Sequence, residues 1–375
     1  MKKIGLKLMF QDHYDNSVAK GVLKYSKNKI DWEINGTGYW FHDDTEEIDA
    51  LIARIETVEE KEMYEKLDIP VVDIAGAFFS DRISTVRNDD WDTGARCGNY
   101  FYNLGVRNFA MCLVSNTNWS RERMLGFCSS LNINYEKLNY FSRSLNWWKD
   151  IYNKNDIEFQ NWLKALPLHT GLFCCNDLSA MKVTNTLRYL SINVPSDIIV
   201  LGVDNEELMC MLSKPTLSSM ALQLEKIGYT AAMVLDSIIE NKNKKLVYRI
   251  PPLDVIERES TTLLFDGDIF VTQAILFIKK YIGSSFSVDD IVNQIGCSRR
   301  TLEIRFRKIL NTSIHSFIVE QKLIKARELL VRTNLQVKEI SSECGFGSLQ
   351  RFHASFIKKY GISPNQYRNQ NSINY

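Results

Sequence analysis

The sequence predicts an α/β domain of parallel strands and flanking helices, followed by an all-α domain with two helix-turn-helix motifs. Three observations support this fold class. Short apolar runs alternate with longer amphipathic segments over residues 1–257, a pattern typical of successive strand and helix units. Two similar segments within residues 288–368 each hold two helices joined by a glycine-containing turn. The chain has 375 residues, more than one hydrophobic core usually covers.

The elements of the first domain follow from its apolar pattern. Five short apolar runs are predicted to be buried strands: KKIGLKLMF, IPVVDIA, NFAMCLV, TGLFCC and IIVLGV. Five amphipathic segments are predicted to be helices between or after them: 15–26, 92–104, 158–165, 180–190 and 225–240. Such an alternation indicates a parallel sheet.

Polar residues follow three of these strands, where an open parallel sheet binds small molecules. The three clusters are residues 11–15, Asn176 with Asp177, and Asp204 with Asn205. Any one of them is explained equally well as a cap of the next helix. Together with Arg123 and several aromatic residues (Tyr14, Trp40, Trp119 and Trp147) they favour a polyhydroxylated ligand. Sugars need carboxylate acceptors, guanidinium or amide donors, and an aromatic plane for the C–H face.

The boundary between the domains is predicted from composition and charge. Pro251 and Pro252 stop regular structure, and the Glu-Ser-Thr-Thr stretch after them has no periodic apolar face. We therefore expect a first domain at 1–257, a linker at 258–268 and a second domain at 269–375, which opens with a helix at 269–281. The net charge is +8 from Asp268 onward and −7 before it. A basic tail domain suggests contact with nucleic-acid phosphates, although a solvated basic surface is the alternative.

The first motif, SVDDIVNQIGCSRRTLEIRFRKILN, turns at Gly296. Ser287 and Ser298 are predicted N-caps, and residues 299–310 are predicted to be a recognition helix. Its buried stripe is expected to be Leu302, Phe306 and Ile309.

The exposed face of that helix suggests base recognition. Arg300 and Glu303, with Ile304 beside them, are expected on the leading face, where Arg suits guanine and Glu suits cytosine. The remaining cations are expected to contact phosphates: Arg299, Arg305, Arg307 and Lys308. The alternative for Glu303 is a simple ion pair with Arg299 or Arg307.

The second motif, QVKEISSECGFGSLQRFHASFIKKYGISPNQYR, turns at Gly345. A helix at about 348–360 is expected to bury Phe352, Phe356 and Ile357. The predicted DNA-facing residues are Gln350, Arg351, His353, Lys358 and Lys359, with Gln suited to adenine and the cations to the backbone. A connecting helix at 314–330 would hold both motifs in successive major grooves, about 34 Å apart.

Other function classes find little support in the sequence. Eight cysteines have no metal or disulfide spacing, so we expect buried reduced thiols. Five scattered histidines show no metal-ligand spacing, and no nucleophile elbow or phosphate loop occurs, so we expect no enzyme, cofactor or metal. No segment resembles a signal peptide or membrane span, so we expect a cytoplasmic protein without a membrane partner.

Several motifs also resemble known families. The stretch NFAMCLVSNTNWSRERMLGF, the segment FCCNDLSA, and IIVLGVDNEELMCMLSKPTLSSM resemble the effector-binding core of the LacI/GalR repressors, a fold shared with periplasmic sugar-binding proteins. The double motif with its Gly-Ile-Ser-Pro-x-x-Tyr-Arg ending resembles the AraC/XylS DNA-binding domain. The combination, over essentially the whole chain, resembles the xylose-operon regulators of the AraC/XylS family. It implies a two-lobed core with a sugar in the cleft and dimerisation through this core.

The resemblance assigns site residues one by one. Arg123 matches the arginine of the RxxGF motif that hydrogen-bonds sugar hydroxyls, and Asp204 matches the acidic residue after the penultimate strand. The other positions implied for the cleft are Tyr14, Asp15, Asp89, Trp147, Asp177 and Asn205. Asn205 stands where many LacI members have a second Asp, a departure that can alter sugar preference. In the DNA-binding domain, Asn311 replaces the usual glycine, although Asn also tolerates the left-handed conformation.

Residues and resemblance together predict a transcription regulator, expected to be an activator, of sugar catabolism genes. We expect a pentose, D-xylose, as effector, and double-stranded DNA, a second copy of the chain and, for an activator, RNA polymerase as partners. The alternatives are another sugar, repression instead of activation, or a protein or phosphoryl input in place of a sugar.

Overall fold

The computed structural model of the chain describes residues 1–10, 12–37, 48–150, 156–241, 245–262, 268–284, 286–333 and 335–371. Gln11, Trp40 and residues 263–267 of the expected linker lie outside these ranges. The chain divides into two compact units. We call residues 1–102 with 106–262 the core unit, and residues 103–105 with 263–375 the helical unit.

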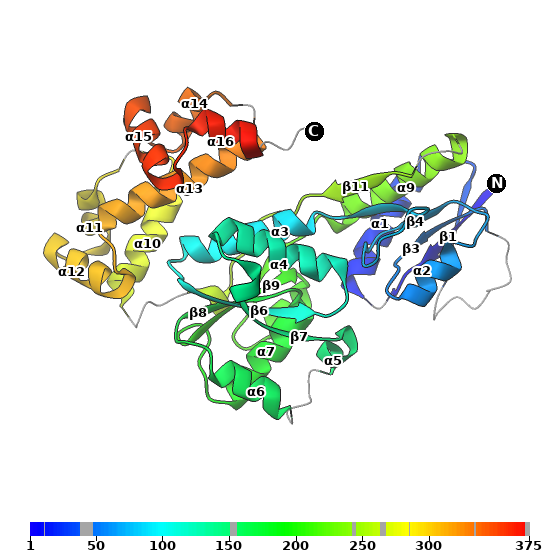
Figure 1. Cartoon of the computed structure of the whole chain (residues 1–375), viewed down its shortest axis with the longest axis horizontal. Coiled ribbons are helices and arrows are strands. Elements are labelled where there is room, and N and C mark those ends of the chain that lie inside the picture. Colours follow the sequence, from blue (N-terminus) through cyan, green and yellow to red (C-terminus); the bar gives the residue numbers. More distant parts are fainter. Residues whose placement is uncertain are drawn as a thin grey trace. The chain divides into compact units, whose positions relative to one another are not determined.

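The core unit consists of two lobes, each built on a six-stranded sheet (Figure 1). The strands of the first lobe are β1 (Lys2–Lys7), β2 (Trp32–Thr37), β3 (Ala50–Ala53), β4 (Val71–Asp73), β5 (Ser84–Asn88) and β11 (Val247–Ile250). They pair in parallel in the order β11-β5-β4-β3-β1-β2. Helices of this lobe are α1 (His13–Ser26), α2 (Val58–Tyr64) and α9 (Leu224–Asn241).

Two glycines allow α1 and α9 to pack very closely. A Cβ atom at Gly21 would lie 1.9 Å from the carbonyl oxygen of Glu225, and one at Gly228 would lie 1.9 Å from that of Val18. Any larger residue at either position would push the helices apart. These glycines therefore join the first and last helices of the lobe into one layer.

The second lobe has the same architecture with one reversed edge strand. Its strands are β6 (Asn108–Val114), β7 (Asn139–Arg143), β8 (Thr170–Cys174), β9 (Ile198–Asp204), β10 (Ser218–Ala221) and β12 (Val255–Ile256). They form the order β12-β10-β9-β8-β6-β7, parallel except for β12. The helices are α3 (Asp90–Asn103), α4 (Asn118–Leu131), α5 (Leu145–Lys149), α6 (Ile157–Lys164), α7 (Asp177–Tyr189) and α8 (Glu207–Leu212).

Helices cover both faces of this second sheet. Figure 1 shows α3 and α4 on one face and α6 and α7 on the other. On the first face Phe127 of α4 stacks on Phe173 of β8, with ring centroids 5.2 Å apart. On the other face the fully buried Trp148 and Phe159 belong to one core cluster with the β6, β8 and α7 residues. Burial on both faces explains why β6, β8 and β9 are continuous apolar runs in the sequence.

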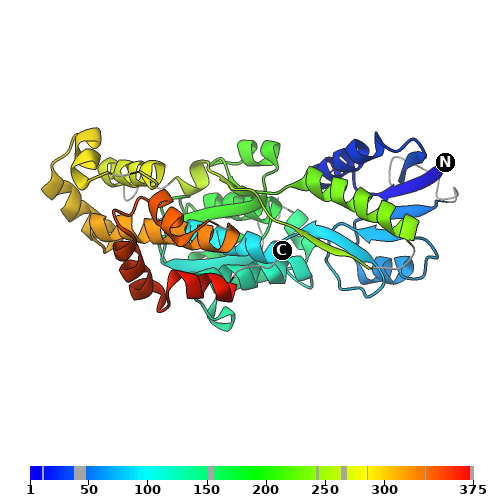
Figure 2. The ribbon, with the colours of Figure 1, turned by 90° about the horizontal axis from the view of Figure 1, so that it is seen from above.

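The described chain passes between the lobes at three places, which Figure 2 shows from above. These passages lie between β5 and α3, between β10 and α9, and between β11 and β12. The strand ends next to the passages bring polar residues of both lobes to one cleft. The predicted α/β fold class is confirmed, while the sequence missed several short elements, including β3, β5 and α5, and the 14-residue helix α4.

The end of the core unit corrects part of the expected linker at 258–268. A short helix at Glu259–Thr261 packs into the second lobe, with Ser260 and Thr261 buried. The Ser260 hydroxyl donates to the carbonyl oxygen of Val200 at 2.7 Å, and the Ser218 amide donates to Ser260 Oγ at 2.9 Å. Hydroxyl hydrogen bonds thus hold residues 258–262 in the lobe. The sequence did not predict this because the segment has no periodic apolar face.

The helical unit is all-α. Its helices are α10 (Ile269–Tyr281), α11 (Val288–Ile295), α12 (Arg299–Leu310), α13 (Ile314–Arg332), α14 (Val337–Glu343), α15 (Leu349–Tyr360) and α16 (Pro364–Asn371). One core joins α10, α11 and α12 to the start of α13, and a second joins the end of α13 to α14 and α15. Gly296, Asn311, Gly345 and Gly361 have φ between 51° and 77°, so left-handed residues follow α11, α12, α14 and α15 as expected.

Candidate functional site

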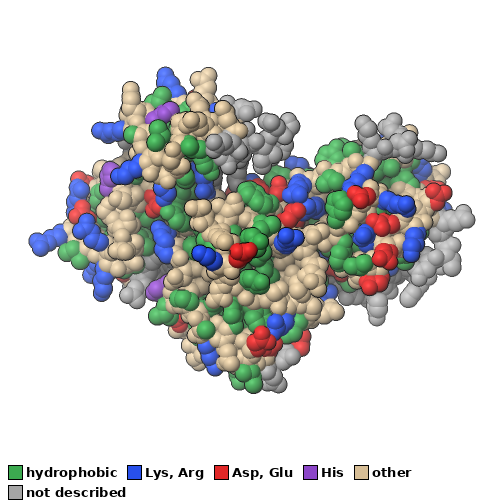
Figure 3. Space-filling view, in the orientation of Figure 1, with side chains coloured by type: hydrophobic (Ala, Val, Ile, Leu, Met, Phe, Trp, Pro, Cys, Tyr) green, Lys and Arg blue, Asp and Glu red, His purple; other side chains and the backbone are tan. Residues whose placement is uncertain are grey.

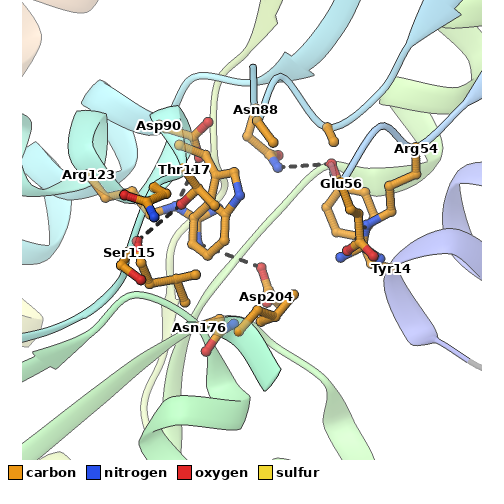
Figure 4. Close-up of a pocket in the computed structure, with 16 residues that line it drawn as sticks. Tyr14, Arg54, Glu56, Asn88, Asp90, Ser115, Thr117, Arg123, Asn176 and Asp204 are labelled. Carbon is orange, nitrogen blue, oxygen red and sulfur yellow. Dashed lines mark hydrogen bonds and ion pairs between the residues drawn. The ribbon is translucent and has the colours of Figure 1, made fainter. Parts of the chain in front are cut away.

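A cavity of about 200 Å³ lies between the two lobes of the core unit (Figure 4). Its polar side chains come from residues at or after the carboxyl ends of strands in both lobes, as expected for open parallel sheets. The charged and polar residues that line it are Tyr14, Arg54, Glu56, Asn88, Asp90, Ser115, Asn116, Thr117, Arg123, Asn176 and Asp204. This volume is below the usual range for drug-sized ligands, about 300–1,000 Å³, and suits a small molecule.

Arg123 of α4 is the central cation on the second-lobe side. It is 4% exposed, and its Nε donates to Asp90 Oδ1 at 2.9 Å. Its Nη1 donates to the carbonyl oxygen of Cys175 and lies 4.0 Å from Asp204 Oδ1. The guanidinium also lies over the Trp119 ring, 5.1 Å from the ring centroid. Two carboxylates and an aromatic plane therefore hold one guanidinium at the wall of the cavity.

The first-lobe side is built around Arg54, which follows β3. Its guanidinium pairs with Asp12 at 2.9 Å, Asp15 at 3.2 Å and Glu56 at 3.1 Å, and lies 5.1 Å from the centroid of the Tyr14 ring. Asp15 is fully buried beneath it and accepts from the Met9 amide at 2.6 Å. Burial raises the pKa of Asp15 to about 6, although Arg54 opposes the shift. Asp15 thus positions Arg54 and does not line the cavity itself.

Tyr14 and Asn88 form a short hydrogen-bond chain across this wall. The Tyr14 hydroxyl donates to the carbonyl oxygen of Ile74 at 3.1 Å and accepts from Asn88 Nδ2 at 3.2 Å. Asn88 Oδ1 is buried and has no hydrogen-bond partner among the described residues. Tyr14 and Asn88 therefore hold each other in place at the cavity wall.

Asp204 ends β9 and has φ of 107°, a conformation that L-residues rarely adopt. Burial raises the pKa of Asp204 well above its usual range, Arg123 opposes this shift, and the Asp177 carboxylate adds to it. Asp177 lies beneath the loop and accepts from the Ser219 hydroxyl at 2.6 Å and the Glu206 amide at 2.9 Å. Asp177 therefore positions the Asp204 loop and borders only the wider mouth of the cleft.

Gly202 makes room for this arrangement. A Cβ atom at Gly202 would lie 2.1 Å from Asp177 Oδ1. The glycine within IIVLGVDN is thus required by the carboxylate that supports Asp204.

Three residues expected in the cleft lie elsewhere. Asp89 caps α3, because its Oδ1 accepts from the Asp92 amide at 3.0 Å, and its neighbours Asn88 and Asp90 line the cavity instead. Asn205 has φ of 51°, and its side-chain oxygen accepts from Arg258 Nη2 at 2.8 Å.

Trp147 is packed into the second-lobe core, and its Nε1 donates to Asp156 Oδ2 at 3.1 Å. Trp119 is the tryptophan in the cavity wall. Because large aromatic side chains occur both in protein cores and in ligand sites, residue type alone did not show which of these two tryptophans lines the cavity.

Sequence reasoning also missed Arg54, Glu56, Asp90, Ser115 and Thr117. Arg54 and Glu56 follow β3, a four-residue apolar run too short to be predicted as a strand. Ser115 and Thr117 follow β6, which was predicted as a strand. Their position after a strand end could therefore have identified them as cavity residues. Together with Asn88, Arg123 and Asp204, these residues present carboxylate acceptors, guanidinium and amide donors, and hydroxyls, which suit a ligand with several hydroxyl groups.

A second candidate surface lies on the helical unit, where α12 borders a groove. The groove is lined by Val288, Arg299, Arg300, Glu303, Ile304, Arg307, Lys308, Ser313, Ile314 and His315. In Figure 3 the Lys and Arg side chains gather over the end of this unit that includes α11 and α12. Arg300, Arg307 and Lys308 are exposed. A cationic helix face beside a groove suits the phosphates and base edges of duplex DNA.

Intramolecular ion pairs hold some of the expected DNA contacts. Arg305 Nη1 binds Asp268 Oδ2 at 2.9 Å, which ties it to the N-cap of α10. Arg299 Nε binds Glu303 Oε1 at 3.0 Å, the alternative foreseen for that pair.

On α15 the predicted contacts differ in availability. Gln350, Arg351 and Lys358 are exposed and His353 is partly buried. Lys359 forms an ion pair with Glu320 of α13. Ile357, expected to point inward, is 45% exposed, because Phe352 and Phe356 already fill the core beneath the helix.

The described residues include neither a candidate metal site nor a membrane-spanning helix. No cluster of three or more His, Cys, Asp or Glu side chains has an arrangement suited to a metal ion. In the same part of the chain, no helix combines the length and apolar character needed to cross a membrane.

Comparison with known proteins places both surfaces in a family context. Residues 99–261 match the family model of a periplasmic binding protein-like domain, and residues 291–370 match that of a helix-turn-helix domain. The chain is 31% identical to the xylose operon regulatory protein of Escherichia coli strain K12, over 96% of this chain and 95% of the relative. It is 30% identical to the protein of the same name from Haemophilus influenzae, over 98% of each.

Solved structures give a similar result. The structure of the xylose-binding transcription activator xylR has a TM-score of 0.59 and 29% identity, and covers 99% of this chain and 98% of that chain. A LacI family transcriptional regulator from Enterococcus faecium, solved with bound ribose, has a TM-score of 0.55 over 69% of this chain and 98% of that chain. At 22% identity, the latter likeness concerns the fold alone.

Proposed function

Because the chain belongs to the family of xylose operon regulatory proteins, which are transcription regulators and not enzymes, we propose that its inter-lobe cavity binds D-xylose and thereby controls binding of DNA by the helical unit. The proposal includes the sign of regulation: the chain activates transcription, because the structurally similar xylR is a transcription activator. An activator also requires contact with RNA polymerase. Because its target is chromosomal DNA, the proposed location is the cytoplasm.

The observation that supports the sugar most strongly is the composition of the cavity. Asp204, Asp90 and Glu56 offer carboxylates, Arg123 and Arg54 offer guanidinium donors, and Trp119 offers an aromatic face. A pentose presents hydroxyls that both donate and accept, and apolar C–H groups that suit an aromatic plane. The small cavity volume also agrees with a monosaccharide.

The mechanism that we propose is a shift in population between open and closed lobes. Residues from both lobes line the cavity, so a bound sugar makes more hydrogen bonds when the lobes close. Closure then changes the affinity of the helical unit for DNA, and linkage requires that DNA changes the affinity for sugar by the same factor.

We further propose that the active species is a homodimer. Helix α8 exposes Leu208 at 70%, Met211 at 58% and Leu212 at 75%, three large apolar side chains on one short helix. Apolar patches of this kind mark interaction sites. Sedimentation of the full chain with a Leu212→Glu variant tests this step, and a monomeric wild-type chain would contradict it.

Calorimetry with a panel of pentoses tests the sugar. We expect D-xylose to release heat with the full chain, and a Trp119→Leu variant to bind it at least ten-fold more weakly. Trp91→Leu is the matched control, because Trp91 is 41% exposed and does not line the cavity. No heat with any pentose, or equal binding by both variants, would remove the support for a sugar site.

A footprint with and without D-xylose tests the output. We expect protection of two half-sites that strengthens when the sugar is present. Protection of equal strength in both conditions would contradict control by xylose while leaving DNA binding intact.

A further inference from the structure

The two recognition helices can be compared residue by residue, because both begin at a serine cap. Ser298 Oγ accepts from the Thr301 amide at 3.1 Å, and Ser348 Oγ accepts from the Arg351 amide at 3.2 Å. Both helices contain 12 residues and end at a left-handed C-cap. The fourth and eighth residues after the serine are buried in both: Leu302, Phe306, Phe352 and Phe356. The same register therefore applies to α12 and α15.

The sixth position after each serine is apolar and exposed. In α12 it is Ile304, whose exposed fraction is 60%. In α15 it is Ala354, which is also exposed. Of the four α12 side chains at helical spacing from Ile304, three are cationic (Arg300, Arg307 and Lys308) and the fourth is Thr301. An exposed isoleucine thus lies in the middle of a cationic face.

Charge complementarity indicates what covers this isoleucine. A partner must present an apolar group surrounded by negative charge. The groove next to Ile304 is also bordered by Arg299, by Glu303, which is paired with Arg299, and by His315. The major groove of DNA has this arrangement wherever a thymine occurs, because the C5-methyl group is flanked by polar base edges and two rows of phosphates. Alanine and larger apolar side chains both contact this methyl group in known readout chemistry.

We propose that Ile304 and Ala354 each contact the C5-methyl group of a thymine, so that the DNA segment bound by one chain requires a thymine at one defined position in each of the two major grooves that α12 and α15 enter. The inference rests on the proposed function, since it assumes that α12 and α15 enter the major groove. Arg300 and Gln350 occupy the second position of the two helices, one turn earlier on the same face. Within the segment bound by one chain, one thymine therefore lies close to the guanine suited to Arg300. The other thymine lies close to the adenine suited to Gln350.

Deoxyuridine tests this contact, because it differs from thymidine only by the methyl group. Duplexes that bind the full chain are first selected from a random pool with and without D-xylose. Each thymine in the selected site is then replaced by deoxyuridine, one at a time, and the dissociation constant is measured by fluorescence anisotropy. We expect wild-type protein to lose about four-fold in affinity when deoxyuridine replaces the thymine contacted by α12, and again for the thymine contacted by α15. This loss corresponds to the free energy of burying one methyl group.

Two variants assign the thymines. Ile304→Ala should abolish the sensitivity at one thymine and keep it at the other, and Ala354→Gly should do the reverse. General weakening of either variant does not affect the result, because each is compared on paired thymine and deoxyuridine duplexes. Leu276→Ala is the matched control, since Leu276 is 50% exposed on α10, and should keep both sensitivities.

Each remaining outcome contradicts the proposal in a recognisable way. Selection of no specific sequence would overturn the inference together with DNA recognition itself. Specific binding with no deoxyuridine effect at any position would overturn the inference alone. If Ile304→Ala lowers transcription but leaves DNA affinity unchanged, an acidic protein covers Ile304 and the thymine contact is wrong.

Discussion

The guanidinium of Arg258 donates a hydrogen bond of 2.8 Å to the side-chain oxygen of Asn205. Asn205 directly follows Asp204, which lines the cavity, and Arg258 lies in the last segment of the core unit before the helical unit. A second bond, from Arg258 Nη1 to the carbonyl oxygen of Leu217 at 2.8 Å, fixes the guanidinium. The cavity loop is thus linked directly to the segment that leads toward the DNA-binding helices.

We expect an Arg258→Gln variant to bind D-xylose normally but to respond to it less. Loss of about 1 kcal/mol of coupling would make the sugar-dependent change in DNA affinity roughly five-fold smaller. Calorimetry measures the first quantity, and anisotropy with and without sugar measures the second. Arg82→Gln is the control, because Arg82 likewise donates a hydrogen bond to a backbone carbonyl oxygen, that of Glu65, but lies in the first lobe. An unchanged sugar response in Arg258→Gln would show that coupling follows another route.

Arg300 and Lys308 should contribute differently to DNA binding. We expect Arg300→Ala to weaken binding by about 1–3 kcal/mol at one base pair and to relax the preference there. Lys308→Ala should weaken binding to all sequences and lower the slope of log affinity against log salt by about one. Anisotropy on specific and scrambled duplexes over a salt series separates the two effects. Equal losses on both duplexes for Arg300→Ala would exclude base recognition by this residue.

Asp15 should make stability depend on pH. Burial raises its pKa from 3.8 to about 6, so the folded chain binds more protons than the unfolded chain between these values. The contribution of Asp15 to the free energy of unfolding should therefore fall as the pH rises from about 4 to about 6, by up to about 3 kcal/mol. Asp15→Asn should reduce this fall. Urea unfolding of both proteins at pH 4, 5, 6 and 7 measures it, and parallel curves would refute the prediction.

Lys182 should support one wall of the cavity from within the core. It is 1% exposed, and its Nζ donates to the carbonyl oxygens of Trp147 at 2.9 Å and Asp150 at 2.6 Å. These bonds hold α5, whose Leu145 lines the cavity. Burial lowers the pKa of Lys182, while Asp150 and Asp156 oppose the shift.

We expect Lys182→Met to lower the free energy of unfolding by about 1–3 kcal/mol, because two carbonyl groups lose their donor. Amide exchange in α5 should accelerate, and the affinity for D-xylose should fall several-fold. Lys164→Met, at an exposed lysine of the same lobe, is the control. Unchanged exchange in α5 would show that other contacts hold this helix.

The helical unit could be predicted almost completely from the sequence. Its boundaries at α10, α12 and α15 agree with the expected helices to within one residue, because serine caps, left-handed Gly or Asn residues and a strong apolar period are all local features. The ending Tyr367-Arg368 also has a local explanation in the structure: Arg368 Nε donates to the carbonyl oxygen of Leu330 at 3.2 Å, and Tyr367 packs against Phe356.

The cleft could be predicted only in part. Tyr14, Arg123 and Asp204 were identified from strand ends and motifs, and all three line the cavity. Asp89 was chosen over its neighbours, yet a helix cap turns it away and presents Asn88 and Asp90. At the junction of β5 and α3, the direction of each side chain depends on the local backbone geometry. This geometry could not be predicted from the sequence.

The sequence by itself determined the order of the two units, the parallel α/β core, the duplicated motifs and the chemical character of both surfaces. These features depend on local periodicity, capping and charge. Only the tertiary structure decided which polar residues meet. Arg54 from one lobe and Arg123 from the other line a common cavity because the chain passes repeatedly between the lobes, at places far apart in the sequence. It also decided which cations are paired within the helical unit, because the ion pairs of Arg305 with Asp268 and of Lys359 with Glu320 join side chains that are 37 and 39 residues apart.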